Sequence, residues 1–310
     1  MRVETDLLRV AIDTRGGTVR EVELKAYPLE AKSPARVQLL HDDATGTFVA
    51  QSGLVASAGT APDHRATFNA ASDSYSLDAG VDTLDVPLTW SDGSGVTVTK
   101  TFHFKRGEYV VGVDEQVRND SAAEWRGGSY RQLQRTAPVR PSKFSFTNPE
   151  AYSFVGAAWY SPEERFEKLA FDKFEKEPLS RQITGGWAAM LQHYFFAAWL
   201  PAAEEAGTYE TQVVAGASPR YLIREKSPSR VVAPVPDDAS ARAQPVQVGG
   251  IEALQVWLPV DPIMPLGQVG VLFSQDGERE QLLRLQRELF LAIALVGLLT
   301  IGAVYAFMLR

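Results

Sequence analysis

Apolar and polar residues alternate along much of this chain, and the alternation predicts β-strands. From Val96 to Phe104 the even positions are apolar apart from Lys100, and the odd positions are threonine or histidine. This period of two is typical of a strand with one buried face. A second alternating segment, Tyr109 to Val117, begins after only four intervening residues. The two segments therefore predict a β-hairpin.

The amino-terminal segment shows the same arrangement. A strand from Leu8 to Ile12 runs into Gly16 and Gly17, which can adopt the positive φ of a turn, and the alternation resumes at Val22. No long amphipathic helix separates strands of this kind before about residue 234. Closely spaced strands without such helices indicate an all-β fold class, a large antiparallel sandwich.

The stretch Gly185–Pro201, GGWAAMLQHYFFAAWLP, breaks the alternation because nearly all of it is apolar or aromatic. An extended chain would bury both faces here, as in a central strand between packed sheets. A helix, which would place Trp187 and Tyr194 on one face, is the alternative. We expect the strand because a glycine pair and a proline bracket the stretch as turn residues. On this interpretation Trp187 and Trp199 both belong to the core.

The composition changes after residue 234, so we expect residues 1–234 to form one domain. Residues 235–250 are rich in Pro, Ala, Ser and Asp and predict a linker. Residues 251–288 are expected to contain two strands and a connecting helix with a leucine stripe. Residues 289–309 carry no charge and are long enough to cross a hydrocarbon layer of roughly 30 Å as a C-terminal transmembrane helix.

Composition narrows the functional classes. The net charge of −7 is spread along the chain without a basic run, so we expect no nucleic-acid partner. The chain has no cysteine, which excludes disulfides and thiolate chemistry. Glycine pairs at 127–128 and 249–250 lack a strand-to-helix context and are interpreted as turns rather than phosphate loops. We expect no catalytic residue, metal site or cofactor. The four histidines show no metal-ligand spacing: His41, His64, His103 and His193.

One segment, residues 160–178, combines both signs of charge with phenylalanine and leucine. The simpler interpretation is a solvated excursion with short helical character. The alternative is an edge at which another protein docks. The sequence by itself leaves both open.

Four ordered stretches of the chain resemble a known family. They are DTRGGTVREVELKAYP, TFHFKRGEYVVGVDEQVRN, FVGAAWYSPEERFEKLAFDKFEKEPLS and GGWAAMLQHYFFAAWLP. Each is similar to the large periplasmic domain of the YidC membrane protein insertases of Gram-negative bacteria, and together they cover about residues 3 to 234. The resemblance implies a β-super-sandwich similar to the galactose mutarotase fold. It also implies a location at the bacterial inner membrane, with the main domain in the periplasm.

The resemblance implies a role in membrane-protein insertion and folding, through chaperone-like contacts or translocon docking, without chemistry of the domain's own. Its partners would be translocon components and nascent membrane proteins. From about residue 235 the sequence looks more like the membrane-proximal end of a bacterial periplasmic sensor, which keeps a transmembrane ligand sensor as an alternative. A carbohydrate-binding domain is a further alternative from fold analogy. Family contacts to the translocon's accessory subunit correspond here to Tyr160, Glu163, Glu164, Phe166, Glu167, Lys168 and Phe171.

Overall fold

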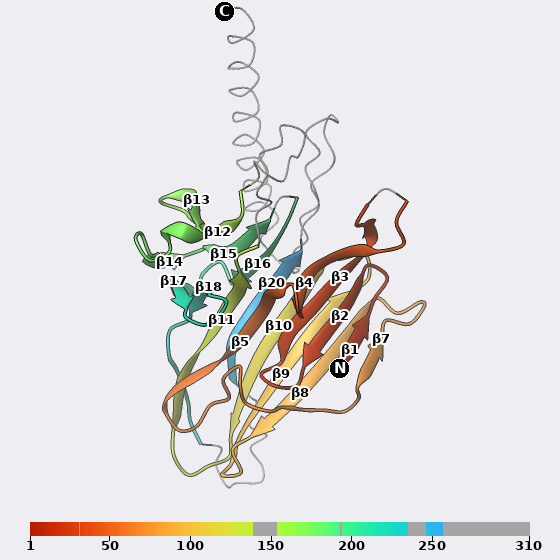
Figure 1. Ribbon diagram of the computed structural model, residues 1–310. Helices are drawn as coiled ribbons and strands as arrows, with labels where there is room; N and C mark the ends of the chain where they lie inside the picture. Colours follow the sequence, from red (N-terminus) through yellow and green to blue (C-terminus); the bar gives the residue numbers. More distant parts are fainter. Residues whose placement is uncertain (31, 139–153, 193, 235–245, 257–310) are drawn as a thin grey trace, which may run out of the picture. The chain divides into compact units, whose positions relative to one another are not determined.

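Two β-sheets pack on one hydrophobic core in the computed structural model (Figure 1). It describes residues 1–30, 32–138, 154–192, 194–234 and 246–256, the last range by its backbone. The larger sheet has eleven strands: β1 (Arg2–Glu4), β2 (Leu8–Asp13), β3 (Thr18–Pro28), β4 (Arg36–Asp43), β5 (Gly46–Ala58), β7 (Ser74–Ser76), β11 (Trp125–Thr136), β14 (Ser180–Thr184), β17 (Ala206–Val214), β18 (Arg220–Lys226) and β19 (Arg230–Val232). The smaller has nine: β6 (Asn69–Ala70), β8 (Thr83–Ser91), β9 (Val96–Lys105), β10 (Val110–Asn119), β12 (Gly156–Ser161), β13 (Arg165–Ala170), β15 (Trp187–Gln192), β16 (Phe195–Pro201) and β20 (Val246–Val256).

The all-β sandwich predicted from the alternation is confirmed. The spatial order of the larger sheet runs β14-β17-β18-β11-β5-β4-β3-β2-β1-β7, with β19 also paired to β11. The smaller sheet runs β13-β12-β15-β16-β20-β10-β9-β8-β6. Neighbouring strands are antiparallel except β1 and β7, which run parallel. A short 3-10 helix, η2 (Phe171–Lys173), follows β13.

Both hairpins expected from the alternation are present. β9 pairs with β10 so that Phe104 lies opposite Val111, and β2 pairs with β3. Gly16 has φ 77° in the turn before β3, and a side chain there would overlap the backbone of His64. Glycine is required at this position both for its φ angle and for its lack of a Cβ.

Lys100, the one charge on the apolar face of β9, lies inside the core and is fully buried. Its Nζ forms an ion pair with Glu115 Oε1 over 3.1 Å and donates hydrogen bonds to the carbonyl oxygens of Gly16 and Ser52. A buried charge is tolerated when it is paired and hydrogen-bonded, and these contacts meet that condition. The polar break in the alternation is therefore part of the core.

The stretch Gly185–Pro201 is a hairpin rather than the single strand predicted from its sequence. β15 and β16 are antiparallel neighbours, with Ala188 opposite Trp199. Reversing the chain within the stretch places Trp187 and Trp199 on opposite faces of the sheet. Trp199 is 1% exposed and lies in the core as predicted, whereas the prediction for Trp187 is wrong because its side chain is only partly buried on the outer face. His193 lies outside the described residues.

The glycine pairs interpreted as turns lie within strands. Gly127 and Gly128 belong to β11, and Gly249 and Gly250 belong to β20. A Cβ on Gly127 would lie 2.5 Å from the Val55 carbonyl oxygen of the neighbouring strand. Gly127 therefore allows close approach of β11 and β5, a use of glycine that the sequence does not distinguish from a turn.

Strand β20 begins inside the stretch expected to be a linker. It lies between β10 and β16, so pairing on both sides outweighs the linker-like composition. Met1–Pro259 forms one compact unit. The expected transmembrane helix at 289–309 and the strand and helix expected between 257 and 288 lie outside the described residues. Within the residues that the structure describes, no helix has the length and apolar character needed to cross a membrane.

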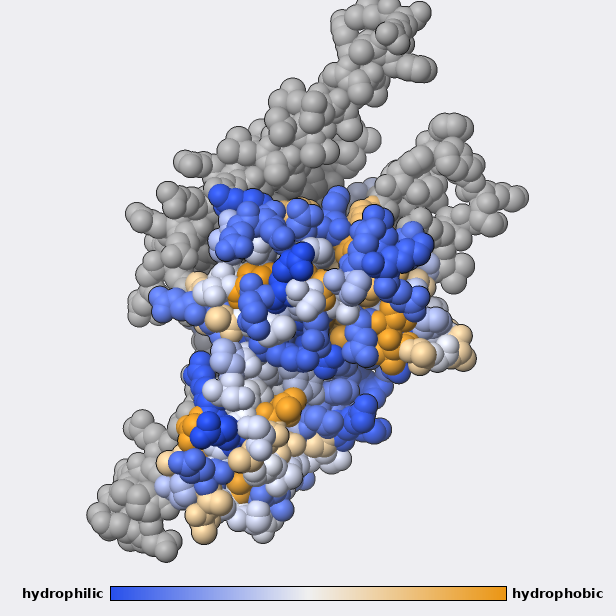
Figure 2. All heavy atoms as spheres, turned by 90° about the vertical axis from the view of Figure 1, so that its left-hand side faces the viewer, coloured by the Kyte–Doolittle hydropathy of each residue, from blue (hydrophilic) through white to orange (hydrophobic). Residues whose placement is uncertain are grey.

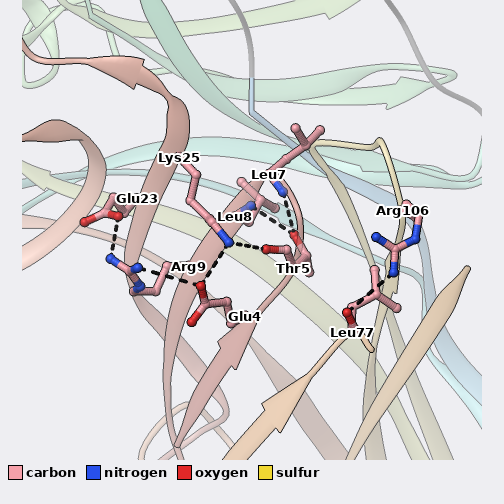
Figure 3. Close-up of polar contacts among 9 residues, drawn as sticks. All are labelled: Glu4, Thr5, Leu7, Leu8, Arg9, Glu23, Lys25, Leu77 and Arg106. Carbon is pink, nitrogen blue, oxygen red and sulfur yellow. Dashed lines mark hydrogen bonds and ion pairs between the residues drawn. The ribbon is translucent and has the colours of Figure 1, made fainter. Parts of the chain in front are cut away.

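Polar contacts fasten the first strand to its neighbours (Figure 3). Lys25 Nζ donates hydrogen bonds to Glu4 Oε1 over 2.9 Å and to the Thr5 carbonyl oxygen over 2.6 Å. Arg9 lies between Glu4 and Glu23, with the Glu23 carboxylate 2.7 Å from its Nη1. The hydrogen bond from Lys25 lowers the pKa of Glu4. Exposed pairs of this kind contribute little individually, so the contacts fix register more than they add stability.

Candidate docking surface on the β12–β13 hairpin

Strand β13 is an edge strand of the nine-stranded sheet, and β12 and then β15 lie next to it in the sheet. The hairpin lies on the left in Figure 1. Its turn is held by the Glu164 backbone N–H, which donates to Ser161 Oγ over 2.9 Å. Arg165 completes the turn with φ 65°, in the left-handed region that few residues other than glycine adopt. The sequence PEE before Arg165 thus forms a tight connection that presents β13 at the edge.

Three aromatic side chains form a row across these strands. Tyr160 on β12 lies opposite Phe166 on β13 and opposite Trp187 on β15. The Tyr160 and Trp187 rings are stacked with centroids 6.1 Å apart, and the Phe166 ring lies 5.8 Å from that of Trp187. Phe166 is 36% exposed. We call these three residues the aromatic row.

A cluster of three alanines, one from each of three neighbouring strands, packs against Trp187 of the aromatic row. Ala158, Ala189 and Ala198 are buried in a cluster separate from the main core. Partly buried apolar residues pack against them: Trp187, Leu191, Phe196 and Leu200. The intervening residues of the same strands, such as Ala157 and Met190, belong to the main core. This part of the sheet is therefore apolar on both faces, which explains the loss of alternation in the sequence.

Charged residues surround the row. Glu163 and Glu164 lie in the turn, and Glu164 is 3.6 Å from Arg181 on β14. Along β13, Lys168 lies on the same side as Phe166, whereas Glu167 alternates to the other side with Leu169. Figure 2 shows this side of the molecule as mainly hydrophilic, with small separate hydrophobic areas. Aromatic residues within a polar rim are typical of protein–protein contacts.

Phe171 is separated from the other residues that the resemblance assigned to contact. It begins η2, and its ring is stacked on that of Tyr221 with centroids 4.5 Å apart, beside Phe174. Phe171, Asp172 and Tyr221 line a cavity of about 390 Å³ together with Ala137, Pro138 and Val155. The structure therefore brings Tyr160 and Phe166 together with Trp187, which sequence reasoning assigned to the core, and places Phe171 elsewhere.

The sequence analysis did not identify one polar cluster, because its residues come from three different strands. His103 on β9 contacts Asp85 on β8 over 2.8 Å and Asp114 on β10 over 3.1 Å. The hydrogen bonds that His103 makes with Asp114 and with Asp85 raise its pKa to about 9, although partial burial opposes the rise. Only cross-strand register, which is not visible in sequence spacing, brings these groups together.

The described ranges contain no group of three or more His, Asp or Glu side chains placed to hold a metal ion. His41 is 3.7 Å from Asp43, and His64 Nδ1 lies 2.6 Å from the Tyr130 hydroxyl. Desolvation lowers the pKa of His64, so its imidazole is neutral at physiological pH. The His64 contact joins a loop to β11, whereas His41 and Asp43 both lie on β4. The surface with the clearest capacity for recognition is the aromatic row with its charged rim.

Curated relatives are membrane protein insertases. A protein of this name from Alkalilimnicola ehrlichii is 41% identical over 235 residues, covering 76% of this chain and 41% of its own length. One from Methylococcus capsulatus is 40% identical over 215 residues, covering 69% of this chain and 39% of its own length. The chain thus spans about two-fifths of the length of these relatives. A relative from Alcanivorax borkumensis is 34% identical over 298 residues, covering 90% of this chain and 50% of its own length.

The Alcanivorax match extends past residue 243 and so does not favour a sensor origin for the last quarter of the chain. Among solved structures, a galactose mutarotase related enzyme from Lactobacillus acidophilus matches with a TM-score of 0.43 and 11% identity over 84% of this chain and 94% of its own. A putative aldose 1-epimerase from Escherichia coli K12 matches with a TM-score of 0.41 and 12% identity over 83% of this chain and 98% of its own. The likeness concerns the fold alone.

The family comparison agrees with the sequence resemblance along the described sandwich. The model of the YidC periplasmic domain matches residues 1–243, which include every described strand before β20. The relatives are named for the insertion of membrane proteins and not for a catalysed reaction. This chain belongs to the family of the YidC periplasmic domain.

Proposed function

We propose that this chain is a periplasmic module that assists the insertion and folding of membrane proteins by docking a partner polypeptide on the aromatic row. The observation that carries the proposal is the exposed Phe166 on an edge strand, supported by Tyr160 and Trp187. Large aromatic side chains held rigidly by their neighbours supply much of the binding energy in protein interfaces. No chemical step is assigned to the module.

The preferred partner is a folded translocon component rather than a nascent chain. The three rings lie in register on neighbouring strands, so the surface is fixed before binding and suits a partner that is also folded. The rim carries both signs of charge, with Glu163, Glu164 and Lys168 near the row. Such a rim favours one orientation of a partner with complementary charges.

Site-specific photo-crosslinking tests this proposal. A photoreactive phenylalanine analogue at position 166 of the full chain, expressed in a Gram-negative host, should crosslink a translocon subunit in the membrane fraction. Val55, which is 61% exposed on β5 of the other sheet, is the matched control position and should give no such product. Equal crosslinking from positions 166 and 55 would contradict docking on the row.

The same experiment separates the two classes of partner. Releasing nascent chains with puromycin before irradiation should leave a translocon crosslink unchanged. Loss of the crosslink after this treatment would show that nascent chains bind the aromatic row. It would contradict the proposal that the partner is a translocon component. Replacing Phe166 by Ser should reduce the crosslink from a neighbouring probe position without changing the melting temperature, because Phe166 lies outside the main core.

A further inference from the structure

Four polar side chains form a buried cluster on the core-facing side of the larger sheet. Tyr209 on β17 lies opposite Glu225 on β18, which lies opposite Arg131 on β11. Arg131 Nη1 donates to Glu225 Oε2 over 2.7 Å, and its Nη2 donates to Glu205 Oε2 over 3.3 Å. The side chains of Arg131 and Glu225 are 1% exposed and that of Glu205 is 7% exposed, while Tyr209 is fully buried.

Three oxygen atoms of this cluster have no hydrogen-bond partner among the described residues. They are Glu205 Oε1, Glu225 Oε1 and the Tyr209 hydroxyl. Two glycines allow these groups to approach the backbone closely: a Cβ on Gly207 would lie 2.4 Å from Glu225 Oε1, and one on Gly186 would lie 3.4 Å from the Tyr209 hydroxyl. Buried polar atoms are almost always paired, with protein or with ordered water. The described protein groups therefore do not satisfy all the hydrogen-bonding oxygens of the cluster.

The cluster also carries an excess of negative charge when all groups are ionised, because two carboxylates share one guanidinium. Glu115 on the opposite sheet also acts electrostatically on Arg131, and it forms its own ion pair with Lys100. Ser52 lies on β5, opposite Arg131. Its hydroxyl donates a hydrogen bond to Glu115 Oε1 over 2.8 Å and adds no charge. Desolvation raises the pKa of Glu225, Arg131 opposes the rise, and Glu205 adds to it. An uncompensated charge inside a protein is costly and is commonly removed by protonation.

We propose that Glu205, Glu225 and Tyr209 enclose a buried site that binds one water molecule and retains one proton at neutral pH. Glu225 in its acid form donates from Oε1 to the water, the Tyr209 hydroxyl also donates to it, and the water donates to Glu205 Oε1. Three hydrogen bonds are the usual number for a buried water. This arrangement satisfies all three oxygens and leaves one carboxylate opposite one guanidinium.

The bound proton links the stability of the sandwich to pH. The folded protein holds a proton that Glu225 releases in the unfolded chain above its ordinary pKa of 4.5. The contribution is therefore fully present below pH 4.5 and decreases as the pH rises through the raised pKa of the folded state. This direction is opposite to that of an ion-paired surface carboxylate such as Glu4, whose pKa is lowered.

Comparison of the wild type with Glu225→Gln in the full chain tests the site, since glutamine reproduces the shape of the protonated acid. The unfolding equilibrium constant of the wild type, divided by that of E225Q, should rise with pH above 4.5, by up to tenfold per pH unit. Glu30→Gln, at an exposed glutamate, is the control and should follow the wild-type profile. Parallel pH profiles for the wild type and E225Q would overturn the proposal.

Two measurements on the wild type apply even where E225Q does not fold. Infrared spectra at pH 7 should show the C=O stretching band of a protonated carboxyl that shifts in D2O, and its absence would overturn the retained proton. A high-resolution crystal structure should show one ordered water in contact with Glu205, Glu225 and Tyr209. A site without water density would overturn the bridging water.

Discussion

The indole Nε1 of Trp199 donates a hydrogen bond to the carbonyl oxygen of Gln132 over 2.9 Å. The bond joins β16 of the smaller sheet to β11 of the larger one, and both partners are buried. The backbone carbonyl of Gln132 thus accepts a hydrogen bond from a side chain of the other sheet. The contact makes Trp199 both a packing residue and a polar connection between the sheets.

Replacement of Trp199 by Ala should lower the free energy of unfolding by about 3–5 kcal/mol, because it opens a cavity in the core and removes the hydrogen bond to Gln132. Trp187→Ala is the matched control, since Trp187 is only partly buried and lies on the opposite face. We expect a smaller loss for this variant. Urea denaturation of both variants gives the two values, and equal losses would contradict the assignment of the two tryptophans to different environments.

The Lys100–Glu115 pair should be costly to break from one side. Lys100→Met leaves Glu115 buried without its cation and should destabilise the protein by about 3–5 kcal/mol. The double variant with Glu115→Gln should recover much of this loss, because no buried charge remains. A double-mutant cycle measures the coupling free energy. Strictly additive effects of the two substitutions would show that the pair is not coupled.

Strand alternation makes the fold class predictable, because one buried face leaves a period of two in the sequence. The hairpins β2–β3 and β9–β10 follow from it directly. The β15–β16 hairpin does not, because both faces of these strands are apolar and the sequence between Gln192 and Phe195 contains no glycine or proline. The sheet face on which Trp187 lies depends on where the chain reverses direction, because a shift of one residue in pairing moves a side chain to the other face.

Long-range register limits what sequence can say about the sites. Tyr160 and Phe166 could be selected from a mixed charged and aromatic segment, but their meeting with Trp187 depends on pairing between β12 and β15. The contacts of His103 with Asp85 and Asp114 likewise depend on three strands. Arg131, Glu205 and Glu225 are far apart in sequence, and no local pattern predicts that the sheet will bury them together.

His103 should titrate with a midpoint of about 9, because Asp114 and Asp85 favour its charged form. Its ordinary pKa is 6.5, so its stabilising contribution is fully present below pH 6.5 and decreases as the pH rises from 6.5 through 9. NMR titration of the imidazole carbons gives the midpoint directly. Asp114→Asn should move the midpoint towards 6.5, with Asp63→Asn as a distant control. An unchanged midpoint in D114N would contradict the role of Asp114.

Strand β20 should be required for the stability of the smaller sheet. It pairs with β10 and with β16, so its removal would turn two interior strands into open edges. A variant that ends at residue 245 should therefore be less stable than one that ends at residue 256, and it should aggregate more readily, because unpaired edges offer backbone groups to other chains. The two variants differ only in β20, which makes the longer one the matched control. Urea denaturation measures the stability difference, and light scattering at the same protein concentration measures aggregation. Identical unfolding midpoints for the two variants would mean that the sheet does not depend on β20, and that the residues matched by the family model already contain everything that its stability requires.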